Sequence, residues 1–132
     1  MRAPCLDIAE ILIAESFATV LGTDIFVADE PDNPVKCITI YDTGGYEPDY
    51  NYTYDRPTVQ VKMREQKGKY PELYVKALAI RDKLLTKQGY ITVANDTKYI
   101  GIWIQSDIFF LGNNQNNQPE IVINFRLHRT DK

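Results

Sequence analysis

Asp42-Thr43-Gly44 is the triplet in this 132-residue chain whose residue types and order could support catalysis. The same triplet after an apolar strand holds the catalytic carboxylate of aspartic proteases, in which two carboxylates share one proton. This chain has one such triplet, so an enzyme of that kind would have to be a homodimer. Two amphipathic helices are also predicted here, whereas those proteases consist almost entirely of strands, and a three-letter match is weak evidence. A dimeric aspartic protease is therefore kept only as a remote alternative.

Metal, phosphate and thiol chemistry find little support in the sequence. Acidic residues in 29–32 and 42–55 could gather around a hard cation, but their spacing matches no EF-hand loop. There is no glycine-rich phosphate loop, and His128 is the one histidine available for a metal site. Cys5 and Cys37 belong to no C-x-x-C pair, so free thiols are favoured over a disulfide between them. We expect no catalytic residue, no cofactor, no metal ion and no enzymatic activity.

Composition indicates one globular domain spanning residues 1–132. The hydrophobic fraction is 44% and the charged fraction is 25%, both ordinary for such a domain. A net charge of −3 argues against general binding to nucleic acids or membrane surfaces. No apolar run reaches the ~18–20 residues of a membrane span. Because Asp7 and Glu10 interrupt the first apolar stretch, a signal peptide is not predicted, and we expect a cytoplasmic protein.

Hydrophobic periodicity predicts two helices and six strands. Apolar stripes with helical spacing cover residues 4–21 and 71–87. Strands are predicted at 24–28, 36–42, 58–65, 90–94, 99–108 and 120–129. The polar Asn/Gln-rich run 112–118 is predicted to be a mobile loop or a hairpin tip. This order favours an α+β fold, a mostly antiparallel sheet with two amphipathic helices packed on one face.

The clearest strand is TVQVKMRE, which alternates apolar and polar residues from position 58 to position 65. Val59, Val61 and Met63 are predicted to face a core. Lys62 and Arg64 are predicted to face water or another subunit.

Residues 43–56 are predicted to form a long loop. Gly44 and Gly45 relax the backbone, and Pro48 and Pro57 lack a hydrogen-bond donor. The loop is rich in tyrosine, which is unusual for a linker without structure. The tyrosines are Tyr46, Tyr50, Tyr52 and Tyr54. Two interpretations stay open, a loop folded back on its own sheet or an arm that docks on a partner, since tyrosine buries area at a small entropic cost.

Charge is distributed unevenly along the chain. Residues 29–55 contain seven acids and one base, whereas residues 62–87 contain eight bases and three acids. An acidic and a basic surface on one subunit favour head-to-tail contacts, which close into rings when the rotation allows it. The alternative is that both are ordinary solvated faces of a monomer.

Four motifs follow one another in an order that resembles a known family. A GTDIFVADEPDNP segment precedes IYDTGG, which is followed by DRPTVQV and then by a helix containing KALAIRDKLL. In this combination the chain resembles the tail terminator family of long-tailed phages, whose members are also called minor capsid or tail completion proteins. The resemblance runs from about Leu6 to the last strand.

This resemblance implies a structural role. Family members are small α+β subunits that form a ring, expected to be hexameric, which caps the tail tube, ends its polymerisation and joins the tail to the head-side neck. The implied partners are other copies of the chain, the tail tube protein and the head-side connector or neck proteins, while DNA passes through the channel without specific binding. The implied location is the tail–neck junction of the virion, after assembly in the host cytoplasm. A head–tail connector or head-completion subunit is the alternative.

The resemblance also implies where contacts lie. The 43–56 loop would be an arm that contacts a neighbouring subunit or the tube. Lys62 and Arg64 would meet the acids of a neighbour or line the channel through which DNA passes. The predicted interface residues are Tyr46, Asp49, Tyr50, Tyr52, Tyr54, Asp55, Arg56, Lys62 and Arg64.

Overall fold

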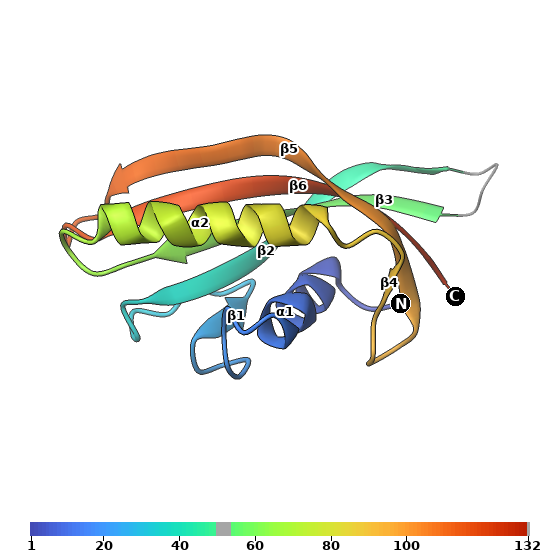
Figure 1. The fold of residues 1–132 in the computed structure, drawn as a ribbon, viewed down its shortest axis with the longest axis horizontal. Helices are drawn as coiled ribbons and strands as arrows, with labels where there is room; N and C mark the ends of the chain where they lie inside the picture. The colour runs from blue at the N-terminus through green and yellow to red at the C-terminus, as the bar shows by residue number, and fades with distance from the viewer. Residues whose placement is uncertain (50–53, 132) are drawn as a thin grey trace.

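The computed structural model describes residues 1–49 and 54–131, which form two helices and a six-stranded sheet (Figure 1). The helices are α1 (Pro4–Ala14) and α2 (Tyr70–Leu85). The strands are β1 (Ile25–Val27), β2 (Cys37–Asp49), β3 (Tyr54–Arg64), β4 (Tyr90–Ile91), β5 (Thr97–Asn113) and β6 (Pro119–Asp131).

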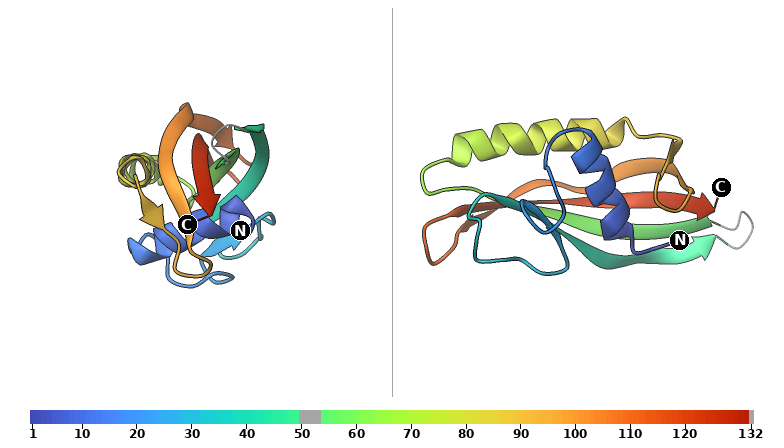
Figure 2. Two further views of the ribbon diagram at one scale, coloured as in Figure 1. Left: turned by 90° about the vertical axis from the view of Figure 1, so that its right-hand side faces the viewer. Right: turned by 90° about the horizontal axis from the view of Figure 1, so that it is seen from below.

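The sheet has the order β1-β2-β3-β6-β5-β4. Every neighbouring pair is antiparallel except β1 and β2, so the predicted α+β class with a mostly antiparallel sheet is confirmed. Two long hairpins, β2–β3 and β5–β6, make up most of the sheet, which is strongly curled when viewed along the strands (Figure 2). Such curling follows from strand twist and from bulges, and both hairpins contain register shifts.

Both helices pack on one face of the sheet, called here the helix face; the opposite face is called the outer face. One core cluster joins Ile8 and Leu12 of α1, Leu73 and Ile80 of α2, and inward side chains of the central strands. Those strand residues, at most 1% exposed, include Val59, Val61, Met63, Ile121, Ile123, Phe125 and Leu127. Alternation along β3 and β6 therefore predicted the buried face correctly.

The first helix is shorter than predicted. The expected helix over 4–21 ends at Ala14, and Ser16 has a left-handed backbone with φ of 66°. The Asp24 carboxylate then accepts hydrogen bonds from the backbone N–H groups of Thr19 and Val20, at 3.0 and 3.3 Å. These bonds give the amides of a would-be fifth helical turn another acceptor, so the chain turns toward β1 instead.

The predicted 43–56 loop is wrong over most of its length. Strand β2 continues to Asp49 and β3 begins at Tyr54, so the stretch is the outer half of a hairpin. Gly44 and Gly45, with φ of 91° and 127°, supply the bulge at which the β2–β3 register shifts. In contrast, the Asn/Gln-rich run proves to be a hairpin tip, closed between Asn114 and Gln118 by hydrogen bonds of 2.9 and 3.0 Å.

Candidate assembly surfaces

The described part of the β2–β3 hairpin tip holds several predicted interface residues. Tyr46 lies opposite Arg56 in the pairing register, and the guanidinium carbon of Arg56 lies 5.8 Å from the centre of the Tyr46 ring. Arg56 Nε also donates to the carbonyl oxygen of Glu47 at 2.8 Å. The Tyr54 ring lies 5.3 Å from the His128 ring of β6. Thus Tyr46, Tyr54 and Arg56 are brought together on the outer face.

The other predicted hairpin residues are placed differently. Asp49 lies opposite Tyr54 in the hairpin. Asp55 turns toward the helix face, where its Oδ2 lies 3.9 Å from Arg129 Nε. Tyr50 and Tyr52 lie outside the described residues.

Lys62 and Arg64 form an ion cluster away from the hairpin tip. Lys62 Nζ lies 2.9 Å from Glu30 and 3.2 Å from Glu120. Partial burial disfavours the charged amine, but these two carboxylates outweigh burial and raise the pKa of Lys62. Arg64 is 6% exposed and donates to the carbonyl oxygens of Pro31, Pro34 and Val35 at 2.6, 2.9 and 2.9 Å.

These contacts pin the segment between β1 and β2 against the outer face. Arg64 therefore faces neither water nor an open surface, because its own chain covers it. The prediction that Lys62 and Arg64 contact a neighbouring subunit stays a prediction. The two residues can influence such a contact through the segment that they hold.

Asp42 of the Asp-Thr-Gly triplet binds the first turn of α1. Its Oδ1 accepts from the backbone N–H of Cys5 at 2.9 Å, and its Oδ2 lies 3.3 Å from the Cys5 thiol. Ala3 at the N-cap offers no side chain to the free amides of that turn, so Asp42 takes over the capping role from another strand. Burial and the Asp42 carboxylate raise the pKa of Cys5 to about 11, which keeps this thiol protonated at neutral pH.

A buried polar cluster joins α1 to β5 and β6. Asp7 is fully buried and accepts from the Tyr99 hydroxyl and from Arg2 Nε, both at 2.6 Å. Arg129 Nη1 donates to the carbonyl oxygen of Arg2 at 2.6 Å and lies 3.5 Å from Asp7. Burial and the Asp7 carboxylate raise the pKa of Tyr99, so its hydroxyl stays a donor. This paired set stabilises the packing of α1 on the sheet.

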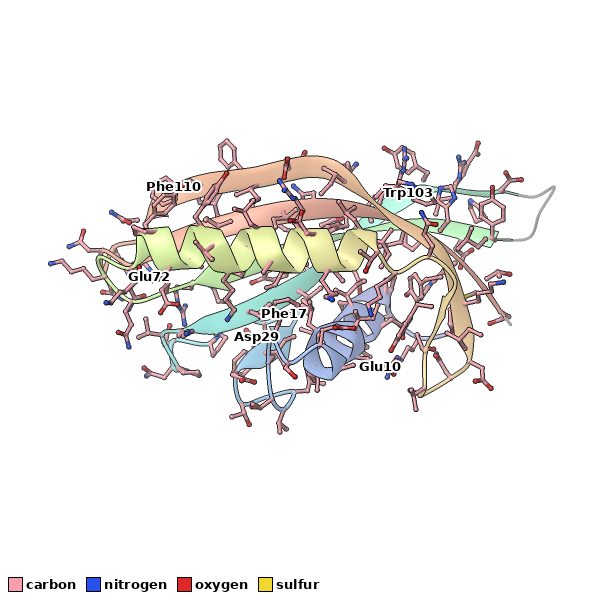
Figure 3. The ribbon with its side chains drawn as sticks, in the orientation of Figure 1. Glu10, Phe17, Asp29, Glu72, Trp103 and Phe110 are labelled. Carbon is pink, nitrogen blue, oxygen red and sulfur yellow. The ribbon has the colours of Figure 1, made fainter. Side chains whose placement is uncertain are left out.

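A group of aromatic and aliphatic side chains is exposed where β5 passes the start of α2. Phe109, Phe110 and Leu111 are 61%, 43% and 48% exposed. The ring of Phe110, which is labelled in Figure 3, lies 4.6 Å from the Tyr70 ring of α2. The Tyr74 ring lies 6.1 Å from the Tyr70 ring and extends the group along the helix. We call these five residues the apolar patch. Phe110 is paired with Ile121 on the helix face and Phe109 with Val122 on the outer face, so the patch flanks the edge strand β5 on both faces. An exposed patch of this kind is typical of a protein–protein interface.

Two sheet edges are unpaired along most of their length. Strand β4 pairs with β5 only at Lys98 and Tyr99, and among the described residues no other strand covers that edge of β5. On the opposite side of the sheet, β1 pairs with β2 only at residues 38–40. The outer half of β2 therefore also has an edge that no described strand covers. Free edges can accept strands from another chain.

A family model described as "Bacteriophage tail terminator protein" matches residues 13–131 of the chain. This chain belongs to the bacteriophage tail terminator family. No curated protein matches it. As a tail terminator it is a structural protein of the phage particle and associates with other tail or head proteins.

Three further observations on this tail terminator concern metal ligands, membrane-spanning helices and the role of Asp42. Among the described residues, no group of three His, Cys, Asp or Glu side chains could hold a metal ion. Within the same residues, neither helix is long and apolar enough to cross a membrane. Asp42 serves as a helix cap, which is a structural task that the triplet alone did not suggest.

Sequence reasoning missed two surfaces of the tail terminator. The strand predicted at 99–108 stopped before the apolar patch, although the run FFL at 109–111 breaks the alternation and could have signalled exposed apolar residues. In the sequence His128 stood out only as the one histidine available for a metal site, whereas in the fold its ring lies 4.7 Å from the Trp103 ring. The alternation of β6 could have placed His128 and Arg126 together on the outer face.

Proposed function

We propose that this tail terminator closes head-to-tail into a ring of six copies that caps the tail tube and ends its polymerisation. The ring also joins the tail to the head-side neck, and DNA passes through its lumen without specific binding. The observation that carries this proposal is the pair of unpaired sheet edges on opposite sides of one subunit. Contacts between two different surfaces of identical subunits produce rings when the rotation closes.

The strand directions support this contact. Three successive antiparallel pairings, β2–β3, β3–β6 and β6–β5, leave β2 and β5 running in opposite directions. The free edge of β5 in one copy can therefore meet the free edge of β2 in the next with antiparallel pairing. The apolar patch lies at the far end of β5 and would lose its exposed surface in the same contact.

The hairpin tip serves as the contacting arm in this proposal. Tyr46, Tyr54 and Arg56 supply aromatic and cationic groups of the kind that dominate binding energy at interfaces. Tyr50, Tyr52, Asp49 and Asp55 belong to the same arm, which reaches a neighbouring subunit or the tube. Lys62 and Arg64 act by holding the segment between β1 and β2, residues 28–36, at the side of the subunit.

The proposal is tested by measuring mass in solution, with and without purified tail tube protein, together with ring-averaged electron microscopy. Sixfold rings, or single subunits recruited to tube ends, are the expected result. A stable dimer that never joins tubes would overturn the proposal and direct attention to a peptide-cleavage assay. Binding to head-side connector protein without binding to tubes would instead support a head-completion subunit.

A further inference from the structure

The outer face forms a trough lined by arginine and aromatic side chains at the level of Trp103. Gln105 Nε2 of β5 lies 3.4 Å from the Tyr46 hydroxyl of β2, although β6 and β3 separate those strands in the sheet. Side chains on strands three positions apart can meet only if the face between them is strongly concave. The curled sheet in Figure 2 has this shape.

We call this surface the arginine–aromatic trough. It consists of Tyr46, Tyr54, Arg56, Trp103, Arg126 and His128. The guanidinium carbon of Arg126 lies 5.5 Å from the centre of the Trp103 ring, much as Arg56 lies over Tyr46. Rings beneath the two guanidiniums hold them by cation–π attraction. Arg56 donates its Nε–H group to the Glu47 carbonyl oxygen, and its terminal Nη groups donate to no described residue.

The two arginines of the trough differ from the others in the chain. Arg2, Arg64, Arg81 and Arg129 each lie within 4.0 Å of a carboxylate. Arg56 and Arg126 make no ion pair with any described residue. Two fixed guanidiniums without carboxylates, on a subunit of net charge −3, indicate a site for a negatively charged partner.

The surroundings favour carboxylates of a protein segment over nucleic acid. Burial, followed by the charges of Arg126 and Arg56, lowers the pKa of His128, so the trough carries two permanent cations at neutral pH and not three. Glu47 and Asp49 lie in the same hairpin as Tyr46 and Arg56, so the positive charge of the trough is confined to a short stretch. Nucleic acids are held by many phosphate contacts along a basic path, which this surface does not provide.

The chain itself offers a matching acidic segment. Asp29 and Asp32 have exposed side chains and make no ion pair with any described residue. Arg64 and Lys62 hold the backbone around them through Pro31, Pro34 and Glu30, so the two carboxylates are presented on a fixed segment. Figure 3 shows Asp29 and Trp103 well separated on the subunit, so the segment of one copy can reach only the trough of another.

We propose that the arginine–aromatic trough of one copy binds the acidic 28–34 segment of the next copy, with Asp29 and Asp32 pairing with Arg56 and Arg126. This inference rests on the proposed function, because it assigns a specific contact within the head-to-tail ring. It also gives the buried Arg64 a part in assembly, since Arg64 fixes the segment that a neighbour would bind.

The test uses charge reversal and complementation in the full chain. One variant carries Arg56→Glu with Arg126→Glu, and the other carries Asp29→Arg with Asp32→Arg. Each alone should weaken subunit association at least about tenfold at low salt, measured by native mass spectrometry and sedimentation. An equimolar mixture should restore association, because alternating copies then place opposite charges at every contact. Circular dichroism melts verify that both variants fold.

Trp103 is the one tryptophan of the chain and gives a second readout. Its emission should change when wild-type copies associate and when the two variants are mixed, but not in either variant alone. The matched control is Lys67→Glu with Lys98→Glu, which changes net charge equally at exposed bases outside the trough and should leave association unchanged.

The outcomes separate this inference from the proposed function. If both variants form rings as well as the wild-type protein does, the trough contact is overturned, while the proposed ring still stands. Rings lost in both variants and not restored by mixing would also overturn the contact. The wild-type protein is also titrated with a dT oligonucleotide and with a peptide of residues 28–34, with Trp103 emission as the readout. Tighter binding of the oligonucleotide than of the peptide would assign the trough to nucleic acid and overturn the contact. No association in any form, including on tube ends, would overturn the proposed function itself.

Discussion

At the scale of single residues, Asp42 illustrates how tertiary contacts assign a role to a motif. Its carboxylate satisfies a backbone N–H of α1 that the local sequence leaves without an acceptor. A catalytic aspartate would instead face a second copy of itself across a dimer axis. Local sequence could not distinguish these roles, because Cys5 and Asp42 are distant in sequence.

Replacing this cap should destabilise the fold. Asp42→Ala removes the acceptor of the Cys5 N–H group and should lower the free energy of unfolding by about 1 kcal/mol, measured by urea denaturation. Glu47→Ala, at an exposed acid of the same hairpin, is the control and should have little effect. Equal effects of the two substitutions would contradict the capping role. Peptide cleavage that disappears in Asp42→Asn would favour the protease alternative.

Tyr90 gives a pH dependence at the same scale. Its hydroxyl donates to Glu10 at 2.8 Å, and burial together with this carboxylate raises the pKa of Tyr90 from 10.0 to about 12. Between these values the unfolded chain has lost the proton that the folded chain keeps, so stability falls as pH rises through this window. In Tyr90→Phe the free energy of unfolding, measured by urea denaturation at several pH values, should fall less steeply above pH 10. Some decline should remain, because the pKa of Tyr99 is raised as well. A decline of unchanged slope in the variant would refute the role of Tyr90.

At the scale of elements, the β2–β3 hairpin depends on two adjacent glycines that play different parts. A Cβ atom on Gly45 would lie 2.6 Å from the Arg56 carbonyl oxygen and the Pro57 Cα, whereas one on Gly44 would meet no atom within 4 Å. Both have positive φ. Sequence reasoning identified the glycines as a loop signal, but the same residues also produce a bulge within a strand.

The two glycines therefore form a matched pair of substitutions. Gly44→Ala should cost about 1–2 kcal/mol, from the left-handed backbone alone. Gly45→Ala should cost more, because the β3 backbone must also move, and it should disturb the hairpin tip. Urea denaturation compares the stabilities, and amide hydrogen exchange of β2 and β3 locates the change. Equal costs at the two positions would show that the short distances from Gly45 to the Arg56 carbonyl oxygen and the Pro57 Cα do not matter.

At the scale of the whole molecule, the exposed surface determines how copies meet. The apolar patch and the free edge of β5 lie on one side, and the free edge of β2 lies on the other. Apart from Tyr70, which packs against the core, the patch residues lie outside the core that the two helices and the helix face enclose. We therefore expect assembly and folding stability to respond to different substitutions.

Phe109→Asn tests this separation. Phe109 is 61% exposed, so the substitution should change monomer stability little but weaken ring formation about tenfold or more, as expected for an aromatic interface residue. Val93→Asn, at an apolar residue that is 87% exposed outside the patch, is the matched control. Native mass spectrometry measures assembly, and thermal melting measures stability. Normal rings in Phe109→Asn would exclude the patch from the subunit contact.

The sequence by itself determined which residues of β3, β6 and α2 are buried, because strand alternation and a helical stripe depend only on local geometry. Its motif order also pointed to the tail terminator family. In α1 the buried face also includes the polar Asp7, which only its partners Arg2 and Tyr99 in the folded chain explain. The tertiary structure alone decided what lies over each face and each edge. Alternation placed Arg64 away from the core, but only the fold shows that residues 30–35 cover it. Likewise, Trp103 and Arg126 become neighbours through the register of β5 and β6, a pairing that links positions far apart in the chain.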